Sequence, residues 1–156
     1  RIIMEFAVFD TGSPYYQQML TLRHEVLRKP LGLNLFEQDL SGEKNYWHFG
    51  LIENDQLIAC LMIIPKNGQA ILKQMAVAPA QQGRSLGKQL MTYCEHELTI
   101  RGMSSISLSA RESAIGFYQK LGYNTVGQCY MEVSINHQKM EKQLLPTLEI
   151  EPQSSI

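Results

Sequence analysis

Residues 82–88 combine two glycines with two cationic side chains directly after an apolar segment. Gly83 and Gly87 allow the main chain to approach a ligand closely. An amphipathic helix is predicted to begin beside them, and the first turn of a helix presents unpaired N–H groups that carry about half a positive charge. Arg84 and Lys88 add two positive charges, so this stretch favours a diphosphate over a carboxylate as its ligand.

Spacing separates this stretch from two other phosphate-binding loops. A Walker A loop needs four residues between its first glycine and Gly-Lys-Ser/Thr, but only three separate Gly83 from Gly87. Gln89 stands where the magnesium-binding hydroxyl of that loop would be. The stretch also lacks the first pair of glycines that the dinucleotide-binding fingerprint Gly-x-Gly-x-x-Gly requires. A nucleotide triphosphatase is therefore disfavoured, and an ordinary strand-to-helix turn is the structural alternative to a ligand loop.

The candidate loop has to be positioned by the elements on either side of it. Apolar residues that alternate predict strands, and apolar residues at spacings of three and four predict helices. Residues 31–45 lack a clear period and are predicted to form a loop or short helix over a cleft. This order of elements predicts an α+β fold with a mixed sheet flanked by helices in three layers. The predicted strands are 2–8, 47–53, 56–64, 70–77, 103–110, 123–132 and 137–142, and the predicted helices are 14–29, 85–101 and 112–121.

Length and composition predict one domain. The chain has 156 residues, of which 44% are hydrophobic, so we expect a single core over 1–145 and a frayed tail over 146–156. The net charge of −1 and the lack of a basic arm argue against nucleic acid as a partner. The longest apolar runs are too short for a membrane span. No metal site is predicted, because His24 and His96 lack ligand partners one helical turn away. Three cysteines without metal-ligand spacing are predicted to be reduced core residues of a cytoplasmic protein: Cys60, Cys94 and Cys129.

Two segments together resemble the GNAT superfamily of N-acetyltransferases. Residues 82–87, Gln-Gly-Arg-Ser-Leu-Gly, resemble its motif A, Gln/Arg-x-x-Gly-x-Gly/Ala. They follow the end of a predicted strand, Met-Ala-Val-Ala-Pro, as that motif does. Ser85 replaces the middle glycine of that motif and must keep a negative φ or accept strain. Residues 110–123 resemble motif B, with Arg111 in the position of its asparagine. Residues 130–140 are similar to the last pair of strands in an ElaA-like bacterial branch, and the resemblance covers about residues 6–142.

The resemblance implies a fold and a cofactor. The fold is a three-layer α/β/α arrangement whose mixed, largely antiparallel sheet is splayed at its central strands. Acetyl-CoA would lie in the splay as the acetyl donor, with its diphosphate on the glycine loop. A backbone N–H near Val77 would stabilise the oxyanion that forms when an amine attacks the thioester. The expected cofactor-binding residues are Met75, Ala76, Val77, Gln82, Gly83, Arg84, Ser85, Leu86, Gly87, Lys88 and Arg111.

The resemblance also implies a catalytic role for Tyr118. Its hydroxyl would donate a hydrogen bond to the departing thiolate and protonate it. A tyrosine pKa of about 10 and a thiol pKa of about 8.5 make the hydrogen bond the safer part of that role. Many members of the superfamily carry a glutamate on the central strand, but residues 69–78 contain no carboxylate. The candidates for a general base elsewhere in the chain are Glu37, His48, Glu112 and His137.

The acceptor is expected to be a primary amine on a small molecule or a peptide. Its cleft would be built from the first helix and residues 31–45, and Arg23 and Arg28 either attract an acidic acceptor or are solvated. A homodimer is compatible with the resemblance. The alternative is a non-catalytic acyl-CoA-binding or regulatory module on the same fold, which the missing strand carboxylate and Ser85 favour.

Overall fold

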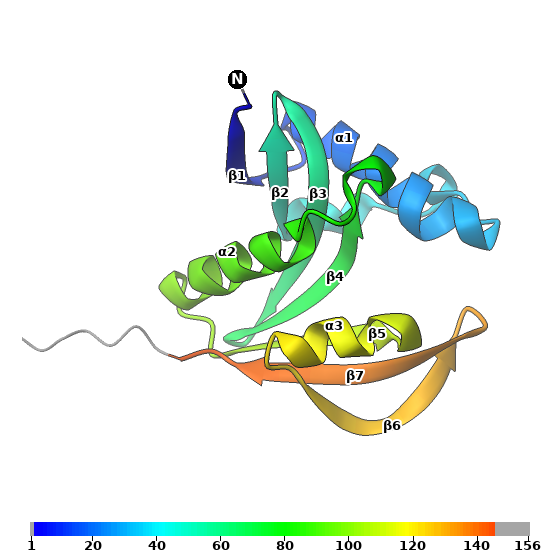
Figure 1. The fold of residues 1–156 in the computed structure, drawn as a ribbon, viewed down its shortest axis with the longest axis vertical. Coiled ribbons are helices and arrows are strands. Elements are labelled where there is room, and N and C mark those ends of the chain that lie inside the picture. Colours follow the sequence, from blue (N-terminus) through cyan, green and yellow to red (C-terminus); the bar gives the residue numbers. More distant parts are fainter. Residues whose placement is uncertain (1, 146–156) are drawn as a thin grey trace, which may run out of the picture.

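The structure, a computed structural model, describes residues 2–145 and builds them around one sheet (Figure 1). The predicted tail, 146–156, lies outside the described residues. No helix among residues 2–145 is both long and apolar enough to cross a membrane. The strands are β1 (Met4–Phe9), β2 (Trp47–Glu53), β3 (Gln56–Lys66), β4 (Gln69–Val77), β5 (Ser105–Arg111), β6 (Asn124–Glu132) and β7 (Ile135–Gln143). The α-helices are α1 (Pro14–Arg23), α2 (Leu86–Ile100) and α3 (Ile115–Lys120).

The sheet is mixed and largely antiparallel. Its seven strands are ordered β1-β2-β3-β4-β5-β7-β6. All neighbouring strands run antiparallel except β4 and β5, which run parallel because α2 forms the crossover between them. The α+β prediction is therefore confirmed.

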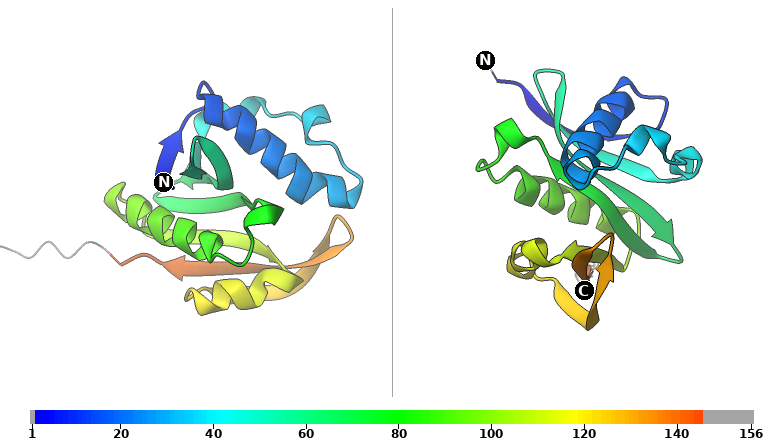
Figure 2. Two further views of the ribbon diagram at one scale, coloured as in Figure 1. Left: turned by 45° about the horizontal axis from the view of Figure 1, so that its top comes forward. Right: turned by 90° about the vertical axis from the view of Figure 1, so that its right-hand side faces the viewer.

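Helices cover both faces of the sheet, as Figure 2 shows. On one face, Met19 of α1 belongs to a buried cluster that includes Met62 of β3. On the other face, Leu90 of α2 belongs to a second cluster that includes Leu61 of β3. Successive side chains of a strand point to opposite faces, so Leu61 and Met62 pack against different helices. This arrangement confirms the predicted three layers.

The sheet splays between its two central strands. The pairing of β4 with β5 extends only from Gln69 opposite Ser105 to Leu72 opposite Leu108. Just beyond that point β4 is bulged against β3, and Gln74 has a φ of +61°. A bulge bends its strand and increases the local twist. Figure 1 shows β4 turning away from β5 and β7, which leaves the main-chain groups of β4 on that side without a strand partner.

The predicted helices differ from the observed ones in their last or first turns. After α1 the chain forms a π-helical turn, His24–Arg28, and then a 3₁₀ turn, Lys29–Leu31. The following loop contains the 3₁₀ turns Leu35–Glu37 and Ser41–Asn45, and α3 is preceded by the 3₁₀ turn Glu112–Ala114. Single π turns within helices are frequent at functional sites because they redirect the side chains around them.

One of the three cysteines departs from the prediction. Cys60 and Cys94 are buried, as expected, but Cys129 is exposed. Cys129 lies on β6, an edge strand of the sheet, which pairs with β7 and is exposed along most of its length. Alternating apolar residues on such an edge do not reach a core, so the expectation for Cys129 was wrong.

A buried polar network joins α1 to the loop that follows it. Arg23 is 1% exposed and forms a bidentate ion pair with Glu43, with both N–O distances at 2.7 Å. The Tyr16 hydroxyl donates a hydrogen bond of 2.8 Å to the same carboxylate, and His48 Nε2 lies 2.8 Å from the Glu43 carbonyl oxygen. Burial alone would raise the pKa of Glu43, but its bonds to Arg23 and Tyr16 hold that pKa below its usual value. Arg23 is therefore a structural residue and not a solvated or acceptor-binding cation.

Tyr16→Phe tests how much this network stabilises the fold. Loss of a hydrogen bond to a charged group costs about 1.5 kcal/mol of unfolding free energy, and we expect that decrease in urea unfolding at pH 7. The neighbouring Tyr15 is half-buried and its hydroxyl is outside the network, so Tyr15→Phe is the matched control. Equal stabilities for the two variants would contradict the role given to the Tyr16 hydroxyl.

Candidate active site

The loop between β4 and α2 leaves the first turn of α2 open. Pro79–Gln81 form a 3₁₀ turn, after which Gly83 has a φ of +87° and Ser85 a φ of +59°. Ser85 is the N-cap residue of α2, and its side chain makes no capping hydrogen bond. The first N–H groups of α2 have no partner within the helix either. Of the two outcomes foreseen for Ser85, the structure therefore has the strained one and not a negative φ.

The strain at Ser85 predicts an unusual gain in stability from a glycine substitution. A left-handed conformation costs a non-glycine residue about 1 kcal/mol, which glycine avoids. We expect Ser85→Gly to raise the free energy of unfolding by roughly 0.5 kcal/mol once the greater chain entropy of glycine is subtracted. Ser113 has no positive φ, so Ser113→Gly should lower stability. Urea unfolding of both variants measures the contrast, and a loss of stability in both would contradict it.

A cavity of about 640 Å³ lies against this loop, and we call it the loop cavity. It runs from the end of β4 across the start of α2 to α3. A Cβ atom added to Gly87, which lines this cavity, would lie 3.3 Å from Met75 Cε and 3.3 Å from Phe117 Cζ, so a side chain here would crowd both residues. The cavity brings together nine of the predicted cofactor-binding residues: Met75, Ala76, Val77, Gln82, Gly83, Ser85, Leu86, Gly87 and Lys88.

The side chain of Arg84 points away from the loop cavity. It forms an ion pair of 2.6 Å with Glu53 at the end of β2, and it also contacts Gln81 Oε1 at 2.5 Å. This ion pair lowers the pKa of Glu53 and raises that of Arg84. Arg84 therefore ties the loop to the end of β2, and unlike its neighbours it does not line the loop cavity.

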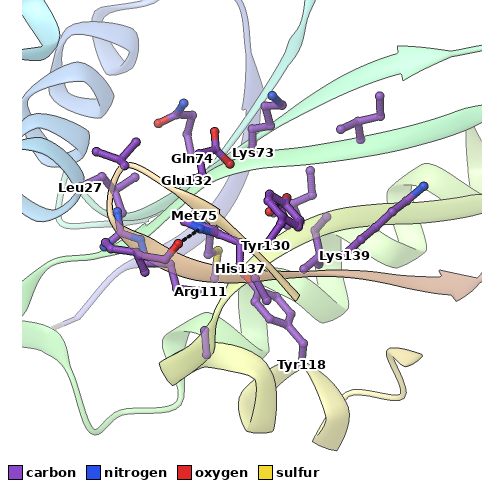
Figure 3. Close-up of a pocket in the computed structure, with 18 of the residues that line it drawn as sticks. Leu27, Lys73, Gln74, Met75, Arg111, Tyr118, Tyr130, Glu132, His137 and Lys139 are labelled. Carbon is purple, nitrogen blue, oxygen red and sulfur yellow. Dashed lines mark hydrogen bonds between the residues drawn. The ribbon is translucent and has the colours of Figure 1, made fainter. Parts of the chain in front are cut away.

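A second cavity, of about 750 Å³, lies between β4 and β5 where the two strands diverge (Figure 3). We call it the hairpin cavity because the β6–β7 hairpin forms one of its walls. Arg111, expected among the cofactor-binding residues, lines this cavity and not the loop cavity. The π-helical and 3₁₀ turns after α1 form the opposite wall. Its polar lining comprises Arg28, Gln38, Lys73, Gln74, Ser107, Ser109, Arg111, Tyr118, Tyr130, Glu132, His137 and Lys139.

Tyr118 lies where the two cavities adjoin. Met75, Ala114 and Tyr118 line both cavities, so the two cavities adjoin at these three residues. The Tyr118 ring is 6% exposed and packs edge-on against the rings of Phe117 and Tyr123. Burial raises the pKa of Tyr118 to about 12. Its hydroxyl therefore keeps its proton at neutral pH and can act as a hydrogen-bond donor.

The structure brings one of the four candidate bases to these cavities. His137 lines the hairpin cavity, with its Nδ1 atom 2.8 Å from the Ile135 carbonyl oxygen and its ring stacked on Tyr130. Glu37 and Glu112 are exposed and line neither cavity. His48 is fully buried beside Glu43, where burial lowers its pKa. His48 lines neither cavity, so the structure does not support it as the base.

The β6–β7 hairpin supplies side chains that the sequence did not single out. Tyr130, Glu132 and Ile135 line the hairpin cavity beside His137, and the Tyr130 hydroxyl is hydrogen-bonded to the Ser109 hydroxyl of β5. The likeness of residues 130–140 to a known strand pair was the available signal. That resemblance predicted the two strands, but it did not predict that the turn between them lies over the gap between β4 and β5. Within residues 2–145 no group of three His, Cys, Asp or Glu side chains is arranged to hold a metal ion.

Comparison with known proteins places this architecture among acetyltransferases. A family model described as an acetyltransferase (GNAT) domain matches residues 13–144. An uncharacterized N-acetyltransferase of Bacillus subtilis, YitI, is 24% identical over 131 residues, which cover 79% of this chain and 88% of YitI. The crystal structure of Escherichia coli ElaA has a TM-score of 0.78 at 23% identity, covering 90% of this chain and 99% of ElaA. An aminoglycoside 6'-N-acetyltransferase crystallised with coenzyme A has a TM-score of 0.75 at 20% identity, covering 91% of this chain and 98% of that one. Both crystal structures share the present fold.

Proposed function

The chain belongs to the GNAT family of acetyltransferases, and on this premise we propose that it transfers an acetyl group from acetyl-CoA directly to a primary amine. The observation that carries the proposal is the pair of adjoining cavities with Tyr118 at their junction. One cavity has an open helix N-terminus for an anion, and the other is a separate space for a second substrate. This arrangement suits a ternary complex in which both substrates are bound before transfer.

The loop cavity fits the phosphate end of coenzyme A. Open main-chain N–H groups at the start of α2 would bind the diphosphate, and Lys88 would add a positive charge. Gly87 keeps the space clear for close approach to the backbone. The free edge of β4 at Met75, Ala76 and Val77 would pair with the pantetheine arm, because β5 no longer pairs with β4 there. The bound cofactor supplies the activated acetyl group.

The residues at the junction suit attack by an amine on a thioester. A backbone N–H near Val77 would donate to the carbonyl oxygen as negative charge develops on it. The amine nitrogen forms a bond to the carbonyl carbon, and the bond from that carbon to sulfur breaks. The Tyr118 hydroxyl would donate a hydrogen bond to the leaving sulfur, and the proton lost by the amine balances the one that the thiolate takes up. The protein would contribute by positioning the two substrates and by polarising the thioester carbonyl.

Direct transfer is favoured over an acyl-cysteine intermediate. Burial raises the pKa of Cys60 to about 12 and also raises that of Cys94, so both thiols stay protonated and unreactive. Cys129 is exposed on β6 and lines neither cavity. Removal of a proton from the amine is assigned to His137, directly or through water, since His137 is the candidate base that lines the hairpin cavity. An amine with a low pKa would need little help from a base, because a larger fraction of it is already neutral at pH 7.

Two measurements test the proposal against a non-catalytic acyl-CoA-binding module. Calorimetry with coenzyme A should detect binding, and incubation with acetyl-CoA and a panel of primary amines should release free thiol at a rate that depends on the amine. Binding without turnover on any amine would favour the non-catalytic module. Absence of binding at millimolar coenzyme A would refute both.

A further inference from the structure

Two guanidinium groups face the hairpin cavity from opposite walls. Arg28 comes from the π-helical turn after α1, and Arg111 is the last residue of β5. Both are half-buried and both line the cavity. Burial, then the positive charges of Arg23 and Arg111, lower the pKa of Arg28. Two positive charges thus line one partly buried cavity.

Neither guanidinium is neutralised by a carboxylate. Among residues 2–145, acidic side chains form ion pairs with Arg23, Lys29, Arg84 and Lys142, but not with Arg28 or Arg111. Arg28 instead donates to two neutral amides, Gln38 Oε1 at 3.0 Å and Gln74 Oε1 at 3.1 Å. These bonds hold the Arg28 side chain at the cavity and leave its charge unpaired. Two like charges that line one partly buried cavity are costly unless an anion binds there.

The remaining charges of the hairpin cavity point the same way. Its charged lining is Arg28, Lys73, Arg111 and Lys139 against the single carboxylate of Glu132. Glu132 is exposed at the hairpin end of β6. The cavity as a whole is therefore cationic, with one acidic group at its rim.

We propose that the acceptor amine carries a carboxylate, which Arg28 and Arg111 bind together in the hairpin cavity. This inference rests on the proposed function. A guanidinium pair recognises a carboxylate through several charge-assisted hydrogen bonds. The anion bound here is distinct from the cofactor diphosphate, because neither arginine lines the loop cavity. The acceptor class is thus an amino acid or another amino-carboxylate, with its ammonium directed toward Tyr118.

The test compares matched substrates. ω-Amino acids of increasing chain length are each assayed beside their own carboxamide, with acetyl-CoA saturating. At the best chain length kcat/KM should be at least about tenfold higher for the acid than for the amide. Equal values for acid and amide at every length would overturn the proposal. Aminoalkyl phosphates form a third arm, and a preference for them over the acids would replace the carboxylate by a phosphate ester.

Variants assign any preference to the two arginines. Arg28→Gln and Arg111→Gln should each lower the ratio of kcat/KM for the acid to kcat/KM for the amide about tenfold. Lys29→Gln is the matched control, because Lys29 is exposed, pairs with Glu25 and does not line the cavity. An acid preference that survives both arginine variants would overturn the proposal.

A binding measurement separates this inference from the proposed function. Calorimetry compares the N-acetylated acid with its N-acetylated amide on the protein saturated with coenzyme A. Tighter binding of the acid, lost in Arg28→Gln, would support the carboxylate site even if no amine were acetylated. Failure of all amines to react would instead refute the transferase. Equal binding of the two products would refute the carboxylate site alone.

Discussion

Gly87→Asp is expected to raise the dissociation constant of coenzyme A about 100-fold. A carboxylate at this position would lie in the loop cavity among the N–H groups proposed to bind the diphosphate. Two like charges about 4 Å apart repel by about 4 kcal/mol near a protein surface, and partial screening reduces this to about the 2.7 kcal/mol of a 100-fold change. The added Cβ atom also crowds Met75 and Phe117 at 3.3 Å. Calorimetry with coenzyme A measures the change.

A second glycine provides the control for this substitution. Gly87 and Gly116 are each the second residue of an α-helix, α2 and α3. Aspartate is favourable in the first turn of a helix, so neither substitution should unfold the protein. An added Cβ at Gly116 meets open space, and Gly116 lines neither cavity. Gly116→Asp should therefore bind coenzyme A as the parent does. Equal affinities in the two variants would remove the diphosphate from the loop cavity.

Tyr118→Phe is expected to lower kcat about 30-fold while the dissociation constant of acetyl-CoA stays within twofold. The phenylalanine ring retains the packing against Phe117 and Tyr123. What is lost is a hydrogen bond to a sulfur that becomes charged during the reaction, worth about 2 kcal/mol. Steady-state kinetics with the best amine, together with calorimetry, separate the two effects.

The raised pKa of Tyr118 adds a pH dependence to this prediction. Its protonated form, the hydrogen-bond donor, is retained up to a pH near its pKa of about 12. Deprotonation of Tyr118 should therefore cause no loss of activity near pH 10, so the unsubstituted protein and Tyr118→Phe should show the same pH profile in that range. Tyr93→Phe is the control, since Tyr93 packs on Phe6 and lines neither cavity. A loss of kcat in Tyr93→Phe as large as in Tyr118→Phe would indicate a general effect of removing a hydroxyl.

Local sequence determined the loop, the helix after it and the family. Both signals are local: one is the spacing of Gly83 and Gly87, and the other is the apolar period of residues 85–101. They could therefore be interpreted without knowledge of tertiary contacts. The GNAT resemblance and the fold it implied are confirmed by the family match over 13–144 and by the ElaA structure. The splay between β4 and β5 followed from that resemblance, because no local pattern reports where two strands separate.

Tertiary structure decided which side chains share a cavity. His48 and His137 both follow strand-like patterns, yet one is buried beside Glu43 and the other lines the hairpin cavity. Arg23 and Arg28 are five residues apart in sequence, but Arg23 is paired inside the core and Arg28 lines the hairpin cavity with Arg111. Periodicity assigns a residue to a face of its own element and says nothing of the element opposite. Long-range packing, here the fold of the β6–β7 hairpin over the splay, makes that choice.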